Sequence, residues 1–166
     1  MKPTDAAVLL PLFGWPDDAP GLVFTERRAD LRRHAGEISF PGGRRDPADP
    51  NLRATALREA EEEIGLDPDA VELAEELPPT NTFVTSYRIH PFVGRIPHPG
   101  DLDLRPNPDE VETLLTFSLD VLREGYAMRR LVRRGVPIHT PTYEVDGHLI
   151  WGATARILGD LLERLG

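Results

Sequence analysis

The feature that most restricts the fold is one expected helix placed between strand-like segments. The pattern predicts a helix from about Asn51 to Ile64, with Asp49 as its cap, Pro50 at its first position and Gly65 at its end. Strand-like segments occur both before and after it, so they must form a sheet on which the helix can pack.

The strand-like segments are apolar runs bounded by turn residues. They are Ala6–Phe13, Leu22–Arg27, Glu37–Phe40, Val71–Glu76, Tyr87–Ile96, Val111–Phe117, Thr142–Val145 and His148–Trp151. Asp146-Gly147 predicts a two-residue hairpin turn, and Ser118 is expected to cap a short helix. The last helix carries an apolar stripe that can pack on the core, at Ile157, Leu158, Leu161, Leu162 and Leu165. This order predicts an α/β fold of the α+β type, with a mixed sheet between helices.

Composition narrows the class of protein. The 166 residues suit one domain, and no apolar run approaches the roughly 18 residues that span a bilayer. The N-terminus lacks the pattern of a signal peptide, and the absence of cysteine fits a reducing compartment, so we expect a cytoplasmic protein. A net charge of -9 argues against nucleic acid or an acidic membrane as partner.

Charge is unevenly distributed along the first half of the chain. Residues 26–45 contain six arginines and three acidic residues, whereas residues 46–63 contain six acidic residues and two arginines. A basic segment beside an acidic one suits a site for metal and phosphate. A mixed, solvated surface is the alternative reading.

Three carboxylates share one face of the expected helix. Glu59, Glu62 and Glu63 stand at i, i+3 and i+4, whereas Glu61 points away from them and Leu57, Ala60 and Ile64 lie on the opposite side. Like charges at this spacing destabilise a helix by about 0.2–0.5 kcal/mol per pair, which a bridging cation removes. Carboxylate oxygens are hard ligands, so the expected ion is Mg²⁺ or Mn²⁺. The alternative is an exposed acidic helix face.

The region from Gly43 to Leu66 resembles the Nudix box, G-x5-E-x7-R-E-U-x-E-E-x-G-U, where U is a bulky apolar residue. The residues that match are Gly43, Arg58, Glu59, Glu62, Glu63, Gly65 and Leu66. Asp49 stands where the box has its first Glu, and eight residues rather than seven separate it from Arg58. We therefore interpret Asp49 as a helix cap rather than a metal ligand.

A second motif upstream resembles the coenzyme A pyrophosphatase branch of that family, L-L-T-x-R-[SA]-x3-R-x3-G-x3-F-P-G-G. Thr25, Arg27, Arg32, Gly36 and Phe40–Gly43 fall in register, and Arg28 departs from it. Thr85-Ser86-Tyr87, Pro91–Gly94 and Trp151-Gly152 are similar to the same branch, so the resemblance covers about residues 6–165.

The resemblance implies one Nudix hydrolase domain over residues 1–166, with the Nudix fold. It implies Mg²⁺-dependent hydrolysis of the pyrophosphate of coenzyme A or its derivatives, to 4′-phosphopantetheine and adenosine 3′,5′-bisphosphate, with Mn²⁺ as a substitute ion. Glu59 and Glu63 are then the principal metal ligands and Glu62 a further ligand or the base that directs water. Substrate-binding residues are Arg27, Arg32, Gly42 and Gly43, and the residues that orient the site are Arg58 and Gly65. Glu110 is a candidate base outside the box, or simply a solvated acid.

Several alternatives stay open. The substrate could instead be ADP-ribose, a dinucleoside polyphosphate or an oxidised nucleotide. The domain could also sense a nucleotide without cutting it, although such domains tend to lose the carboxylates retained here. We interpret Arg129, Arg130, Arg133 and Arg134 as a surface or subunit-contact feature rather than a nucleic-acid patch, in a monomer or homodimer. We interpret His34 as a packing or hydrogen-bonding residue.

Overall fold

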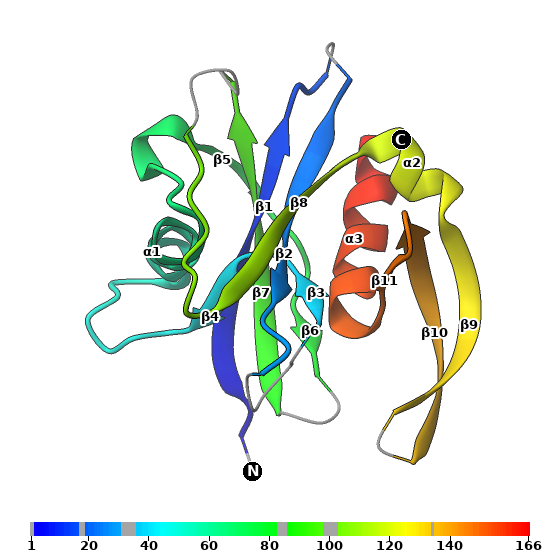
Figure 1. Ribbon diagram of the computed structural model, residues 1–166. Helices are drawn as coiled ribbons and strands as arrows, with labels where there is room; N and C mark the ends of the chain where they lie inside the picture. The colour runs from blue at the N-terminus through cyan, green and yellow to red at the C-terminus, as the bar shows by residue number, and fades with distance from the viewer. Residues whose placement is uncertain (1, 17–18, 31–35, 83–85, 98–102, 134) are drawn as a thin grey trace.

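The computed structural model describes residues 2–16, 19–30, 36–82, 86–97, 103–133 and 135–166. A mixed sheet stands between two helices (Figure 1): α1 (Leu52–Ile64) covers one face and α3 (Gly152–Leu165) covers the other. A smaller sheet lies on the far side of α3 (Figure 1). The expected α+β fold, with a mixed sheet between helices, is therefore confirmed.

The large sheet is built around β1 (Thr4–Phe13), which pairs in parallel with β7 (Tyr87–Ile96) along its whole length. The sheet order is β3-β2-β1-β7-β5, with β8 paired to β2, β4 to β1 and β6 to β7. Every pair except β1–β7 is antiparallel. The bounds of these strands are Gly21–Arg27 (β2), Ile38–Ser39 (β3), Gly42–Arg44 (β4), Glu72–Glu76 (β5), Thr80–Asn81 (β6) and Val111–Ser118 (β8). A short 3₁₀ turn, η1 (Pro68–Ala70), precedes β5.

The small sheet follows α2 (Leu119–Glu124), which Ser118 caps as expected. It contains β9 (Tyr126–Arg133), β10 (Val136–Val145) and β11 (His148–Ile150), in the order β11-β10-β9. Val145 pairs with His148, so the hairpin turn expected at Asp146-Gly147 is confirmed. The sequence did not predict β9, because its apolar residues and arginines follow no regular alternation and most of the strand is exposed.

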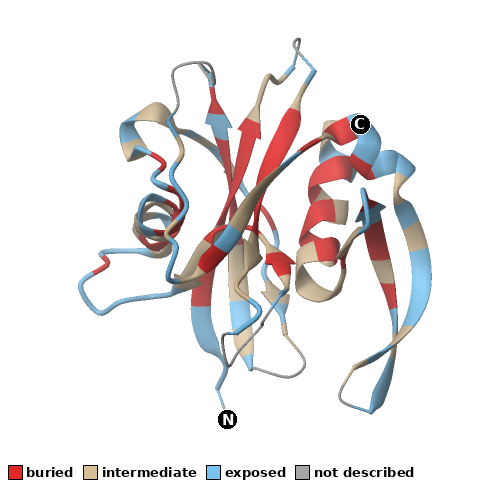
Figure 2. Ribbon diagram, in the orientation of Figure 1, coloured by how far each residue is buried: buried red, intermediate tan, exposed pale blue. Residues whose placement is uncertain are grey.

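Apolar residues of β1 are buried on both faces of the large sheet, which explains why this segment is apolar without interruption. Ala7 and Leu9 pack toward α1, whereas Leu10 and Leu12 pack toward α3. Figure 2 shows the buried residues along the middle of the sheet and on the sides of both helices that face it. The apolar stripe expected on α3 is buried at Ile157, Leu158, Leu161 and Leu162.

The start of α1 differs from the sequence prediction. Asn51, not Asp49, caps the helix, because the side-chain oxygen of Asn51 accepts the N–H of Ala54 at 2.9 Å. The interpretation of Asp49 as the cap was therefore wrong. Gly65 ends the helix in the left-handed conformation, with φ of 68°, as expected of a glycine in this position.

Candidate active site

Two glycines of β4 allow close packing at the start of the box loop, which is the loop of residues 45–51 between β4 and α1. A Cβ on Gly42 would lie 2.3 Å from the carbonyl oxygen of Ala7, and one on Gly43 would lie 2.7 Å from the carboxyl carbon of Glu59. Gly42 also donates its backbone N–H to Glu63 Oε2 at 3.0 Å. Gly42 therefore lets β4 lie close against β1, and Gly43 lets it lie close against Glu59 of α1, because neither position has a side chain.

Glu63 is the most buried of the three carboxylates, with an exposed fraction of 9%. Burial raises the pKa of Glu63 to about 8, with further contributions from Glu59 and Glu110, while the Gly42 N–H and Arg27 act in the opposite direction. Burial also raises the pKa of Glu59, and the Arg58 guanidinium opposes that increase. Glu59 and Glu63 therefore do not belong to the exposed acidic face that the sequence left open as the alternative.

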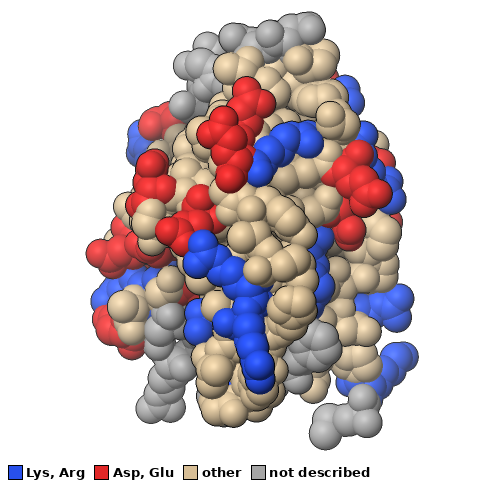
Figure 3. Space-filling model, turned by 90° about the vertical axis from the view of Figure 1, so that its right-hand side faces the viewer, with Lys and Arg blue, Asp and Glu red and all other residues tan. Residues whose placement is uncertain are grey.

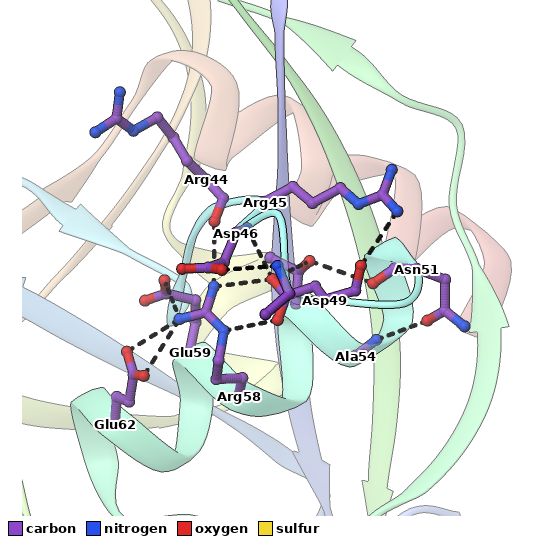
Figure 4. Close-up of polar contacts among 11 residues, drawn as sticks. Arg44, Arg45, Asp46, Asp49, Asn51, Ala54, Arg58, Glu59 and Glu62 are labelled. Atoms are coloured by element: carbon purple, nitrogen blue, oxygen red, sulfur yellow. Dashed lines mark hydrogen bonds and ion pairs between the residues drawn. The ribbon is translucent and has the colours of Figure 1, made fainter.

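Arg58 connects the box loop to the carboxylates (Figure 4). Its Nε and Nη2 donate to the two oxygens of Asp49 at 2.9 and 3.0 Å, and its Nη1 donates to Glu59 at 3.0 Å and to Glu62 at 3.2 Å. Nη2 also reaches the carbonyl oxygen of Arg44 at 3.3 Å. The Glu62 side chain is 56% exposed and turned toward Arg58, so it stands apart from the buried Glu63.

Asp49 is a buried acceptor that the sequence did not predict. Besides Arg58, it accepts the hydroxyl of Thr55 at 2.8 Å and the N–H of Asp46 at 2.9 Å. These hydrogen bonds hold the pKa of Asp49 well below its usual range, with that from Arg58 the largest cause. The sequence offered two signals: Asp49 stands where the box motif has Glu, and one extra residue separates it from Arg58. Neither signal identifies the hydrogen-bond partners of Asp49.

Arg27, at the end of β2, and Glu110, directly before β8, belong to segments that lie next to each other. The pairing of these strands shifts between Glu26 and Arg27, so Arg27 stands opposite Val111 instead of Glu112. Glu110 contributes to the raised pKa values of Glu59 and Glu63, and Arg27 favours the ionised form of Glu63. The Asn107 N–H donates to the Glu63 carbonyl at 2.8 Å, and the Arg28 N–H donates to the Glu110 carbonyl at 3.0 Å, so the end of β2 and the turn before β8 are joined to the acidic helix. Arg32, His34 and Thr85 lie outside the described residues.

The donors at this site fit a hard divalent cation. Glu59 and Glu63 supply carboxylate oxygens beside a loop without side chains at Gly42 and Gly43. Among the described residues, no three His, Asp or Glu side chains are gathered as a ready-made metal site. Mg²⁺ commonly uses one or two carboxylates and completes its shell with water and substrate phosphates.

The other arginine cluster lies elsewhere, on β9. Figure 3 shows basic side chains in a band on the face that carries the small sheet, with acidic groups nearby. Arg129 pairs with Glu144 at 2.8 Å, and the Arg133 guanidinium lies 4.6 Å from the centre of the Trp151 ring. Arg134 is not among the described residues. Arg129 and Arg133 are thus engaged in contacts within the protein surface.

The fold, with its carboxylates on α1, is that of a class of hydrolases. The NUDIX domain family matches residues 4–135. The chain is 40% identical over 163 residues to the "Uncharacterized Nudix hydrolase NudL" of Escherichia coli O1:K1, covering 97% of this chain and 82% of the relative. The chain therefore belongs to the Nudix family, and the expectation that it is a Nudix pyrophosphatase is confirmed.

Solved structures show the same fold. RenU, a Nudix hydrolase of M. smegmatis, matches with a TM-score of 0.59 and 20% identity, over 75% of this chain and 76% of that one. The NUDIX domain of Shewanella oneidensis NrtR, complexed with ADP ribose, matches with a TM-score of 0.63 and 14% identity, over 100% of this chain and 90% of that one. An Ap4A hydrolase of C. elegans matches with a TM-score of 0.57 and 15% identity, over 69% of this chain and 80% of that one.

Membership in the family carries two general consequences. Nudix hydrolases use divalent metal ions such as Mg²⁺, and they act on small nucleotide substrates. None of the helices in the described ranges is long and apolar enough to cross a membrane.

Proposed function

We propose that this chain, as one Nudix domain, is a Mg²⁺-dependent coenzyme A pyrophosphatase that forms 4′-phosphopantetheine and adenosine 3′,5′-bisphosphate. The observation that carries the proposal is the junction of two segments. The segment from Arg27 to Gly43, which resembles the coenzyme A branch, ends on the acidic helix through the Gly42–Glu63 hydrogen bond of 3.0 Å. This contact supports one site in which the segment binds phosphate and the carboxylates hold the metal ion.

Glu59 and Glu63 are the proposed metal ligands, with Glu62 as a further ligand. When bound, Mg²⁺ lowers the pKa of water, neutralises the phosphates and orients the leaving group, and Mn²⁺ substitutes for it. Gly42 orients Glu63 by its N–H, and Arg58 orients Glu59 and Glu62 through the contacts described above. Gly65 supports the same site by ending α1 directly after Ile64.

The base is assigned to Glu62 or to Glu110. Glu62 can turn from Arg58 toward a water molecule, because its side chain is half exposed. Glu110 has the support of the turn that carries it: the Asn107 N–H donates to the Glu63 carbonyl at 2.8 Å, and the Glu110 N–H donates to the Asn107 carbonyl at 3.1 Å. Its charge also contributes to the raised pKa values of Glu59 and Glu63. Variants Glu62→Gln and Glu110→Gln separate these roles, since loss of the base lowers kcat with little change in KM.

Arg27 and Arg32 are the proposed phosphate contacts, because the guanidinium group binds phosphate bidentately. Arg27 ends β2 beside Val111, near the carboxylates, in a position from which it can meet the substrate. Gly42 and Gly43 leave the backbone open to the pyrophosphate.

The decisive experiment incubates the protein with coenzyme A and Mg²⁺ and identifies the products by mass. ADP-ribose, diadenosine tetraphosphate and an oxidised nucleoside triphosphate at equal concentration complete the panel. A higher kcat/KM for coenzyme A than for every other compound supports the proposal. A higher value for one of the others contradicts the substrate but not the class of enzyme. A panel without any Mg²⁺-dependent product would instead favour a nucleotide sensor.

Dephospho-coenzyme A tests the arginines, since it lacks only the 3′-phosphate. If Arg27 or Arg32 reads that phosphate, its replacement by Ala reduces kcat/KM for coenzyme A about tenfold or more relative to dephospho-coenzyme A. Arg53→Ala, which removes an exposed arginine of α1, is the matched control. Equal losses on both substrates would show that neither arginine reads this group.

A further inference from the structure

Arg28 holds the turn that carries Glu110. The Arg28 backbone N–H donates to the Glu110 carbonyl at 3.0 Å, and Nη1 donates to the Pro108 carbonyl at 3.0 Å. The other side of the guanidinium binds the Asp30 carboxylate, from Nε at 2.9 Å and also from Nη2. Arg28 thus has a fixed orientation that links the end of β2 to residues 80 positions later in the chain.

The same turn is attached to the acidic helix on its other side. The N–H of Asn107 donates to the Glu63 carbonyl at 2.8 Å, and the N–H groups of Glu110 and Val111 donate to the Asn107 carbonyl at 3.1 and 2.9 Å. Asn107 Oδ1 accepts the N–H of Asp109 at 3.0 Å. Residues 107–111 therefore form a bridge from the helix to the strand end at Arg28.

We propose that Arg28 is a positioning residue for hydrolysis: it holds the Asn107–Glu110 turn so that the Glu110 carboxylate stays beside Glu59 and Glu63. The proposal rests on the proposed role of Glu110 in the site. Arg28 stands where the upstream motif has Ser or Ala. The support that Arg28 gives to the turn is therefore not a feature that the motif requires.

The role of Arg28 is geometric rather than electrostatic. Asp30 neutralises its guanidinium in a bidentate pair, so little net charge faces the metal or the phosphates. The contact that matters is the one to Pro108, because the turn otherwise depends on backbone hydrogen bonds alone on the strand side. Removal of the Arg28 side chain frees Glu110 to move from the carboxylates, and small displacements of a catalytic group cost large factors in rate.

The test is a double-mutant cycle on the best substrate of the panel, so that it does not depend on coenzyme A being that substrate. Arg28→Ala is expected to lower kcat about tenfold with less than about a twofold change in KM. In the Glu110→Gln background the same substitution is expected to change kcat by less than about twofold. Multiplicative losses in the double variant would overturn the proposal, as would a Glu110→Gln variant with wild-type kcat.

Two further variants separate positioning from general stability. Arg28→Lys retains a donor for the Pro108 carbonyl and is expected to recover part of the loss. Arg105→Ala is the matched control, because Arg105 forms a similar exposed pair with Asp103, from Nε at 3.1 Å, and its side chain does not touch the turn. Its kcat is expected to stay at the wild-type value. An equal loss of kcat in Arg28→Ala and Arg105→Ala contradicts the proposal.

Amide hydrogen exchange gives a readout that does not need turnover, should Glu110→Gln be too slow to measure. In the full-length protein, Arg28→Ala is expected to speed exchange at Glu110 and Val111, whose N–H groups bond to Asn107. Arg105→Ala should leave it unchanged. Unchanged exchange in Arg28→Ala means that the side chain does not hold the turn and overturns the proposal.

Discussion

Arg58 binds Asp49 through both of its carboxylate oxygens, from Nε at 2.9 Å and from Nη2 at 3.0 Å (Figure 4). Asp49 is buried, so the pair has few competing water molecules. This pair fixes the box loop to α1 and leaves Nη1 of Arg58 directed at Glu59 and Glu62.

Asp49→Asn should weaken both the loop and the site. The substitution removes the negative charge and one acceptor, so Arg58 loses part of its anchor and can collapse onto Glu59 and Glu62. We expect a melting temperature several degrees lower and a reduced kcat. Asp46→Asn is the control, because the Asp46 carboxylate is exposed and accepts one local N–H, from Ala48 at 2.8 Å. Equal melting temperatures for the two variants would contradict the anchoring role.

Glu59→Gln and Glu63→Gln should abolish most turnover while the fold is retained. Each removes a carboxylate that the proposed site uses to hold the ion, so kcat should fall about a hundredfold or more at saturating Mg²⁺. Glu61→Gln, an exposed glutamate of the same helix, is the matched control and should retain wild-type kcat. Circular dichroism checks the helix content. Near-wild-type turnover in either of the first two variants would remove that residue from the ligand set.

The raised pKa of Glu63, about 8, makes stability without metal depend on pH. Because this pKa lies above the ordinary glutamate value, the folded protein binds the Glu63 proton more tightly than the unfolded chain does. The resulting stabilisation is fully present below the ordinary glutamate pKa and is lost as pH rises through 8. In EDTA, the melting temperature should fall between pH 5 and pH 8, and Mg²⁺ should reduce the fall.

Glu63→Gln supplies the control for this pH dependence. Its side chain carries no ionisable proton and keeps an oxygen for the Gly42 N–H, so the melting temperature of the variant in EDTA should depend less on pH. Parallel curves for the wild-type protein and the variant would show that Glu63 does not titrate in this range.

Gly43→Ala should displace Glu59, since the new Cβ would lie 2.7 Å from its carboxyl carbon. We expect the Mg²⁺ concentration for half-maximal rate to rise about tenfold, with a smaller change in melting temperature, because the Glu59 side chain can move. Measuring the hydrolysis rate at increasing Mg²⁺ concentrations gives this half-maximal concentration. An unchanged Mg²⁺ requirement would mean that Glu59 does not need the space at Gly43 in order to hold the ion.

Local pattern was sufficient for much of the fold. The bounds of β7, the capped helix α2, the hairpin at Asp146-Gly147 and the buried stripe of α3 all follow from periodicity and turn chemistry. The pattern failed where burial is one-sided or slight. β9 is a mostly exposed strand at the edge of its sheet. Its sequence therefore has no alternation of apolar and polar residues that would predict a strand.

The site divides in the same way. The sequence by itself determined that Glu59, Glu62 and Glu63 share a face of one helix, because the helical repeat sets that spacing. Only the tertiary structure decided that these glutamates differ: Glu63 is buried against Gly42, and Glu62 is exposed beside Arg58. It also decided that Asp49 anchors Arg58 instead of capping the helix. Burial and hydrogen bonding depend on which strand and loop pack against the helix, and those contacts come from residues distant in the chain.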